Sequence, residues 1–186
     1  SGIGFMMAPN HHPAMKNVMP TRKSIGIRTI FNILGPLANP ANVKYQLTGC
    51  YDEKLLKPMI HTLKNLNCES AWLVYGLDGT DEISISGPTK VIELKNNLIK
   101  EFTLKPEDFG LPLSPLDNIK GKDPKYNAQQ IRNLLNGEIS SYRDSVIMNS
   151  SSALYISGKV KTLHEGVEMS KNSIDSGKAL NSLKIA

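Results

Sequence analysis

Three acidic residues, Asp78, Asp81 and Glu82, fall within five consecutive positions of the segment GLDGTDEIS, residues 76–84. Carboxylate oxygens are ligands that Mg²⁺ prefers, and a protein-bound Mg²⁺ commonly keeps several waters and bridges to a substrate phosphate. In an irregular turn, Asp81 and Glu82 could both point at one such cation. The alternative is a solvated acidic turn whose aspartates hydrogen-bond their own backbone. Composition alone favours this alternative and leaves the metal site open.

A second segment, residues 11–41, reads HHPAMKNVMPTRKSIGIRTIFNILGPLANPA and carries several cationic side chains but no acidic residue. A generic surface helix mixes both signs, so this segment favours contact with an anion. Arg22 is the best candidate for binding a carboxylate, because its planar guanidinium donates two parallel hydrogen bonds. The alternative for Arg22 and its cationic neighbours is a solvated helix face. His12 is expected at a helix entry or lining a pocket, because adjacent histidines seldom chelate one ion.

The overall charge restricts the classes of ligand. The net charge of +5 and the isoelectric point near 9.1 favour anionic ligands. The basic excess is modest and forms no Lys/Arg block, which argues against a nucleic-acid partner. Cys50 and Cys68 are the only cysteines and show no metal-binding spacing, so a reducing, cytoplasmic setting and core positions are expected. No apolar run approaches the length of a membrane span.

The periodicity of apolar residues predicts an α/β fold with a mixed sheet flanked by helices. Residues 43–51 and 71–77 are strand-like and flank an amphipathic helix at 53–66, which together make a parallel βαβ unit. The segments EISI, TKVIEL and LIKEFTL are expected to add antiparallel strands, and residues 105–125 a loop. Helices are expected at 13–25, 28–34, 127–136, 143–157 and 160–175, with a short one at the tail. In this fold the acidic segment follows a strand, at the edge where open sheets bind ligands.

The two segments together resemble a known family. HHPAMKNVMPTRKSIGIRTIFNILGPLANPA followed by GTDEIS closely resembles the anthranilate phosphoribosyltransferases, with the motifs in the family's order and at a matching separation. PEDFG, VIMNSSSALYISGK and IDSGKAL resemble the family too, so the resemblance runs essentially from end to end. It implies a catalytic domain of the nucleoside phosphorylase/phosphoribosyltransferase type. It also implies transfer of the phosphoribosyl group of 5-phosphoribosyl-1-pyrophosphate (PRPP) to anthranilate, with Mg²⁺, in tryptophan biosynthesis.

The resemblance also implies a set of site residues. Asp81 and Glu82 would hold a magnesium ion on the pyrophosphate side. The other positions match the part of the family's motif that binds anthranilate. Arg22 would contact the anthranilate carboxylate, and the path that anthranilate follows would be lined by His12, Gly35 and Pro36. The family has no obvious general base, so no catalytic residue is assigned. Neutralisation of the leaving group by Mg²⁺ and positioning of the amine would supply most of the rate.

The chain departs from the family in length. Members are close to twice as long, and their N-terminal half carries a helical domain, through which they dimerise, and a glycine-rich GTGGD loop that does not occur here. The resemblance therefore implies that residues 1–186 are the C-terminal portion of the catalytic domain and are inactive alone. Two alternatives remain: an enzyme similar to the pyrimidine nucleoside phosphorylases, and a non-catalytic anion-binding fragment.

Overall fold

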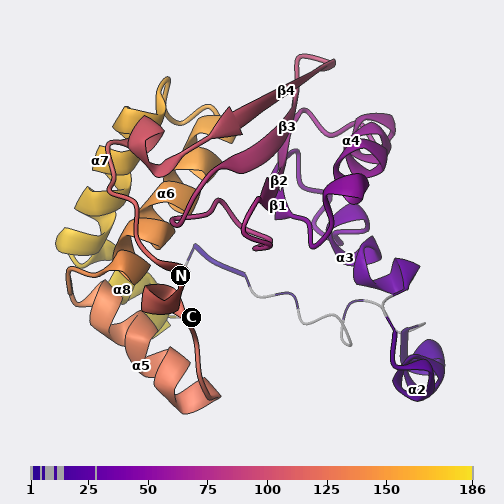
Figure 1. The fold of residues 1–186 in the computed structure, drawn as a ribbon, viewed down its shortest axis with the longest axis horizontal. Coiled ribbons are helices and arrows are strands. Elements are labelled where there is room, and N and C mark those ends of the chain that lie inside the picture. Colours follow the sequence, from indigo (N-terminus) through magenta and orange to yellow (C-terminus); the bar gives the residue numbers. More distant parts are fainter. Residues whose placement is uncertain (1, 5, 7–10, 12–14, 28, 186) are drawn as a thin grey trace.

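The computed structural model describes residues 2–4, 6, 11, 15–27 and 29–185, and only the backbone of Met15, Lys16 and Arg22 (Figure 1). The strands are β1 (Tyr45–Gly49), β2 (Ser70–Gly76), β3 (Thr89–Lys95) and β4 (Leu98–Leu104). The helices are α2 (Met15–Ile25), α3 (Leu34–Leu37), α4 (Leu56–Asn65), α5 (Pro124–Leu135), α6 (Ser141–Ile156), α7 (Leu163–Asp175) and α8 (Lys178–Ile185). Short 3₁₀ helices occur at Ile30–Asn32, Glu53–Leu55, Pro106–Phe109 and Leu116–Ile119. Within this described part, no helix is both long and apolar enough to cross a lipid bilayer.

The four strands form one mixed sheet in the order β1-β2-β3-β4. β1 and β2 pair in parallel, with α4 between them in the chain, while β2–β3 and β3–β4 pair antiparallel. This confirms the predicted fold class, a βαβ unit extended by antiparallel strands. The turn between β3 and β4 contains Asn96 and Asn97, which both have a positive φ. Asparagine tolerates that left-handed conformation better than most residues, so this pair is a turn signal in the sequence.

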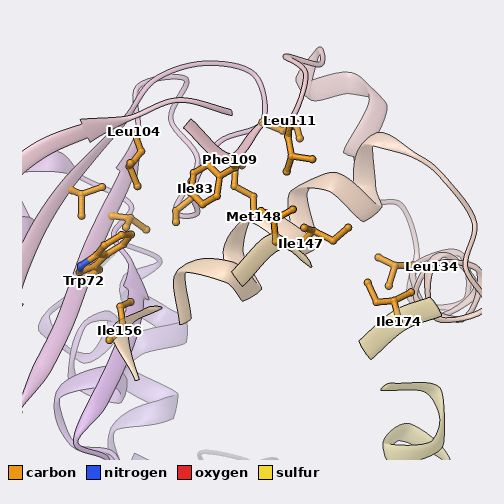
Figure 2. Close-up of a cluster of buried hydrophobic side chains, with 14 residues drawn as sticks. Trp72, Ile83, Leu104, Phe109, Leu111, Leu134, Ile147, Met148, Ile156 and Ile174 are labelled. Carbon is orange, nitrogen blue, oxygen red and sulfur yellow. The ribbon is translucent and has the colours of Figure 1, made fainter. Parts of the chain in front are cut away.

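Helices cover the two faces of the sheet, α4 on one side and α6 with α7 on the other (Figure 1). Successive side chains of a strand point to opposite faces, so β2 contributes to both cores. Trp72 and Val74 pack with α6, whereas Leu73 packs with α4. Figure 2 shows Trp72 from the sheet in one cluster with Met148 from α6. Burial on both faces explains why β2 is a continuous apolar run in the sequence.

The long C-terminal helices begin at side-chain caps and end at glycines. The caps of α5, α6 and α7 accept a hydrogen bond from the backbone three residues on, and they are Asp123, Ser140 and Thr162. The glycines after these helices, Gly137, Gly158 and Gly177, all have a positive φ. Glycine adopts that conformation without strain and therefore stops a helix. The three predicted helices are confirmed, with each boundary within three residues of the prediction.

α6 and α7 approach each other closely at one point. A Cβ added to Gly166 of α7 would lie 2.5 Å from Ser151 Oγ and 2.9 Å from Ser151 Cα. The Ser151 hydroxyl donates a hydrogen bond to the Leu163 carbonyl oxygen over 2.6 Å. Ser151 and Ser152 are fully buried, so these two serines serve helix packing.

One predicted strand is absent from the structure. The segment EISI, residues 82–85, lies within a fully described connection, residues 77–88, that contains no strand. Ile83 and Ile85 are both buried, which produced the alternating pattern in the sequence. Their backbones are not paired with a strand, because the Asn149 side chain pairs with Ile83, and the Ile85 carbonyl oxygen accepts a hydrogen bond from Ser114 N. The pattern therefore indicated burial correctly and secondary structure incorrectly.

The helix predicted at 28–34 is also different. Residue 28 lies outside the described residues, and the following chain forms a 3₁₀ turn, Ile30–Asn32, and then the short helix α3. Gly35 and Pro36 lie inside α3, although they were expected to end a helix. Proline is tolerated in the first turn of a helix, because the N–H groups there have no partner within the helix. The Pro36 carbonyl oxygen accepts a hydrogen bond of 2.7 Å from Gln46 Nε2, which fastens α3 to β1.

Candidate functional site

The acidic turn lies at the carboxyl ends of two neighbouring parallel strands. β1 ends at Gly49 and β2 ends at Gly76. A Cβ added to Gly49 would lie 1.4 Å from the carbonyl oxygen of Asp81, so the backbone of the turn rests directly on the end of β1. A Cβ added to Gly76 would lie 2.2 Å from Thr80 Oγ1 and 2.5 Å from Asp78 Oδ1. The two glycines thus bring the turn to the sheet edge where open α/β folds bind ligands.

Asp78 is occupied by hydrogen bonds within the turn. Its Oδ1 accepts hydrogen bonds from Thr80 N, over 3.1 Å, and from Thr80 Oγ1, over 2.8 Å. Its Oδ2 accepts hydrogen bonds from the hydroxyls of Ser84 and Ser86. Burial by itself would raise the pKa of Asp78, but these donated hydrogen bonds outweigh it and lower the pKa below its ordinary value. Asp78 therefore behaves as a turn-forming aspartate, the alternative that composition favoured.

Substituting Asp78 gives a pH-dependent prediction. A carboxyl whose pKa is lowered by folding contributes stability above its unfolded pKa and loses it as the pH falls through the folded pKa. We expect Asp78→Asn to lower the free energy of unfolding at pH 7 by about 1–2 kcal/mol, because hydrogen bonds to a charged group are lost. The deficit should shrink as the pH falls below the ordinary pKa of aspartate. Urea unfolding at several pH values checks this, with the exposed Asp117→Asn as a control; a deficit independent of pH would contradict it.

Asp81 and Glu82 border two cavities beside this turn. One, of ≈ 360 Å³, is also lined by Leu116, Asp117 and Lys120, and the other, of ≈ 330 Å³, by residues of β1 and α6. A larger cavity of ≈ 820 Å³ runs along α7 and contains neither carboxylate. The acidic pair thus borders two pockets that are open to solvent, which a hydrated cation with a phosphate group could share.

The electrostatics of the pair fit a cation. Burial, and then the neighbouring negative charge of Asp81, raise the pKa of Glu82 above its ordinary value. An ion between the two carboxylates would relieve that repulsion. Among the described residues, no group of three or more His, Cys, Asp or Glu side chains could hold a metal ion. The described residues would therefore offer the two carboxylates of Asp81 and Glu82, an open oxygen-ligand set that suits Mg²⁺ better than a closed structural metal site.

α6 supplies a polar wall that sequence reasoning missed. Tyr142, Ser145 and Asn149 line the same cavity as Asp81 and Glu82. Their spacing of three and four residues puts them on one face of the helix. Burial and the negative charge of Glu82 raise the pKa of Tyr142, so its hydroxyl stays protonated beside the carboxylates. A polar stripe on a helix that is otherwise mostly buried was a signal that could have revealed this wall.

Cys50 directly follows Gly49, the last residue of β1, and lies beside the acidic turn. Burial, and then the charge of Asp81, raise the pKa of its thiol to about 11. The Cys50 side chain is 2% exposed and its Sγ lies 3.7 Å from Met59 Sδ. Cys50 is therefore a protonated core residue, as expected, and not a nucleophile, because the thiolate is the reactive form of cysteine.

The anthranilate-side residues of the sequence prediction are described only in part. His12 lies outside the described residues, and Arg22 is described only as backbone within α2. Gly35 and Pro36 lie in α3, which packs beside α4 through Leu37. Figure 1 shows α2 beyond α3 and apart from the sheet. The chain in this arrangement does not bring α2 against the acidic turn, and the pairing of Arg22 with Asp81 and Glu82 stays a prediction.

A family model described as "Glycosyl transferase family, a/b domain" matches residues 1–180. A curated relative, anthranilate phosphoribosyltransferase of Rhodopseudomonas palustris, is 52% identical over 184 residues, which make up 99% of this chain and 54% of the relative. The chain thus spans about half the length of the curated relatives it matches.

Solved structures of proteins with the same name have the same fold. Anthranilate phosphoribosyltransferase from Thermus thermophilus superposes with a TM-score of 0.90 at 36% identity, covering 97% of this chain and 54% of that chain. The enzyme from Saccharomyces cerevisiae in complex with PRPP and Mg superposes with a TM-score of 0.85 at 31% identity, covering 93% of this chain and 50% of that chain.

Proposed function

The chain belongs to the glycosyl transferase family, a/b domain, and from this premise we propose that its protein is an anthranilate phosphoribosyltransferase of tryptophan biosynthesis. The reaction breaks the bond between C1 of the ribose and the pyrophosphate of PRPP and forms a bond from C1 to the anthranilate nitrogen. The proton of the amine passes to solvent. The observation that supports this most is the Asp81–Glu82 turn at the ends of β1 and β2. It occurs in a chain that is 52% identical in sequence to a relative of that name.

In this proposal, Asp81 and Glu82 hold Mg²⁺ on the pyrophosphate side. An ion held there would supply positive charge to offset the charge that develops on the leaving pyrophosphate. The chain contributes a pair of carboxylates whose backbone rests on Gly49. The side chains of Asp81 and Glu82 are both exposed, so a hydrated cation can reach them, and it would relieve the repulsion from Asp81 that contributes to the raised pKa of Glu82.

His12, Arg22, Gly35 and Pro36 bind anthranilate in this proposal, with the guanidinium of Arg22 on the substrate carboxylate. The hydrogen bond from Gln46 to the Pro36 carbonyl oxygen supports it, because it fixes α3 relative to β1. No residue is assigned as a general base. Positioning the amine against C1 can supply an effective concentration of ~10⁵ M or more, which makes a base unnecessary for most of the rate.

We also propose that residues 1–186 are the C-terminal portion of the catalytic domain, and that the complete enzyme is a cytoplasmic homodimer that includes an N-terminal helical domain. The share of the relatives' length that the chain covers, 54%, supports this. The purified chain by itself should then form no product from PRPP and anthranilate, whereas the complete protein should form N-(5-phosphoribosyl)anthranilate.

Variants of the complete protein separate the two halves of the proposed site. Arg22→Ala should raise the KM for anthranilate on the order of 10-fold or more, because a hydrogen-bonded charge pair is lost. Asp81→Asn combined with Glu82→Gln should instead lower Mg²⁺-dependent turnover on the order of 100-fold, because the ion loses its protein ligands. The loss of anthranilate fluorescence measures the transfer reaction in both variants. If both variants matched the parent, the site assignment would be wrong.

A separate assay tests the alternative function. If the parent protein cleaved thymidine with phosphate and transferred nothing to anthranilate, a nucleoside phosphorylase would be favoured.

A further inference from the structure

The amide side chain of Asn149 pairs with both backbone polar groups of Ile83, the residue that follows Glu82. Ile83 N donates a hydrogen bond to Asn149 Oδ1 over 3.1 Å, and Asn149 Nδ2 donates one to the Ile83 carbonyl oxygen over 3.2 Å. The two residues are 66 positions apart in the chain. Asn149 thus joins α6 to the acidic turn at its second carboxylate.

Ile83 needs this partner because it is buried and its backbone is not paired with a strand. Ile83 is 1% exposed, and its side chain lies in the core cluster that includes Trp72 and Met148 (Figure 2). The fully described residues 77–88 form no strand, so no sheet ladder satisfies this backbone. A buried peptide group without a partner costs free energy. A primary amide both donates and accepts hydrogen bonds, so it can pair with the N–H and the carbonyl oxygen of one residue, as a neighbouring strand would; an apolar side chain cannot.

Asn149 is itself held in place and faces the carboxylates. Its Nδ2 also donates a hydrogen bond to the Ser145 carbonyl oxygen one helical turn earlier, over 3.0 Å. The Asn149 side chain lines the ≈ 330 Å³ cavity that Asp81 and Glu82 border. On the opposite side, Gly49 lies against the backbone of Asp81. The turn is therefore held between the end of β1 and one face of α6.

We propose that Asn149 is a positioning residue for the Mg²⁺ ligands. By fixing the backbone of Ile83, it fixes the direction in which the preceding Glu82 points, and with it the separation of Glu82 from Asp81. Asn149 touches neither the ion nor the substrates in this role. The inference rests on the proposed function, because it assigns Asn149 to the metal side of that same site.

The first test measures metal binding directly in the complete protein. Mn²⁺ serves as the probe in place of Mg²⁺, and electron paramagnetic resonance counts the free ion in the presence of PRPP. Asn149→Ala should weaken Mn²⁺ binding about 10-fold or more, the range seen when a group that orients a metal ligand is removed. Asn149→Leu keeps the branched shape and the number of side-chain heavy atoms but also lacks the amide. It should weaken Mn²⁺ binding equally, and it serves if the alanine variant does not fold.

The matched control is Ile156→Ala, which removes a buried side chain at the far end of the same helix. It should lower the melting temperature while leaving Mn²⁺ affinity within about twofold of the parent, because additive effects are the rule for distant sites. In the transfer assay, the two Asn149 variants should raise the Mg²⁺ concentration that gives half-maximal turnover. The increase should match the factor by which they raise the dissociation constant for Mn²⁺. The KM for anthranilate should stay unchanged.

The outcomes separate the two ideas. A parent protein without transfer to anthranilate would refute the proposed function, and the Mn²⁺ comparison would still decide the role of Asn149. Mn²⁺ affinity equal to the parent in both Asn149 variants would refute the positioning role. The positioning role would also be refuted if Ile156→Ala weakened Mn²⁺ binding as much as Asn149→Ala does, because the effect would then track stability alone.

Discussion

Replacing Gly49 by alanine should lower the activity of the complete protein at least about 100-fold and its free energy of unfolding by about 2 kcal/mol or more. The added Cβ would lie 1.4 Å from the Asp81 carbonyl oxygen and 2.4 Å from the carbonyl carbon. Both atoms belong to the backbone, so no side-chain rotation relieves the overlap, and the turn must leave the end of β1. A displacement of about 1 Å in positioned groups is enough for a loss of this size.

The control for Gly49 is a glycine in the connection that carries the acidic turn, residues 77–88. Gly87→Ala places its Cβ in open space, with no heavy atom within 4 Å and no positive φ to strain the backbone. It should therefore behave as the parent in both activity and unfolding. Activity assays and urea unfolding on the two variants form the measurement. If Gly49→Ala turned over substrate as fast as the parent, activity would not depend on the contact between Gly49 and the backbone of Asp81.

Removing the carboxylate of Asp175 should destabilise the fold at a place away from the site. Arg143 NH2 lies 2.7 Å and 2.8 Å from the two Asp175 carboxylate oxygens, and Arg143 NH1 donates a hydrogen bond to the Gly137 carbonyl oxygen over 3.1 Å. The Arg143 side chain is 10% exposed and that of Asp175 is 53% exposed. The pair joins the start of α6 to the end of α7. Asp175→Ala would leave a guanidinium buried without its partner.

We expect Asp175→Ala to cost about 2–3 kcal/mol, below the usual cost of breaking a fully buried pair because Asp175 is half exposed to water. The matched control is Glu168→Ala, which removes an exposed pair with Lys171 on the same helix and should cost less than about 0.5 kcal/mol. Denaturant midpoints compare the two. Equal losses would contradict the claim that burial of Arg143 decides the energy.

The sequence allowed the prediction of elements whose signals are local. The stripe of Leu56, Met59, Ile60 and Leu63 predicted α4, and it is buried against the sheet as a periodic stripe requires. The helix ends at Gly137, Gly158 and Gly177 could be predicted because a positive φ favours glycine. These features depend on residues close together in the chain, so short windows of sequence contain the interactions that determine them.

The candidate site depends on contacts that no short window contains. The segment EISI was predicted as a strand because two buried isoleucines alternate with polar residues. Its backbone is instead satisfied by Asn149, 66 positions away from Ile83. The sequence pattern places Gly49 in a strand, but its contact with Asp81 follows only from the parallel pairing of β1 with β2. The acidic residues of the turn could be identified from the sequence, but the groups that hold the turn in place could not.

The close contact between Gly166 and Ser151 means that α6 makes two different contacts. One face of this helix meets α7 with almost no clearance, and another carries Asn149 to the acidic turn. Because tightly packed surfaces transmit displacement, a substitution that shifts α7 should also shift α6 and, under the proposed function, the acidic turn. Substitutions meant to stabilise the protein are therefore better placed in α4, on the opposite face of the sheet from α6.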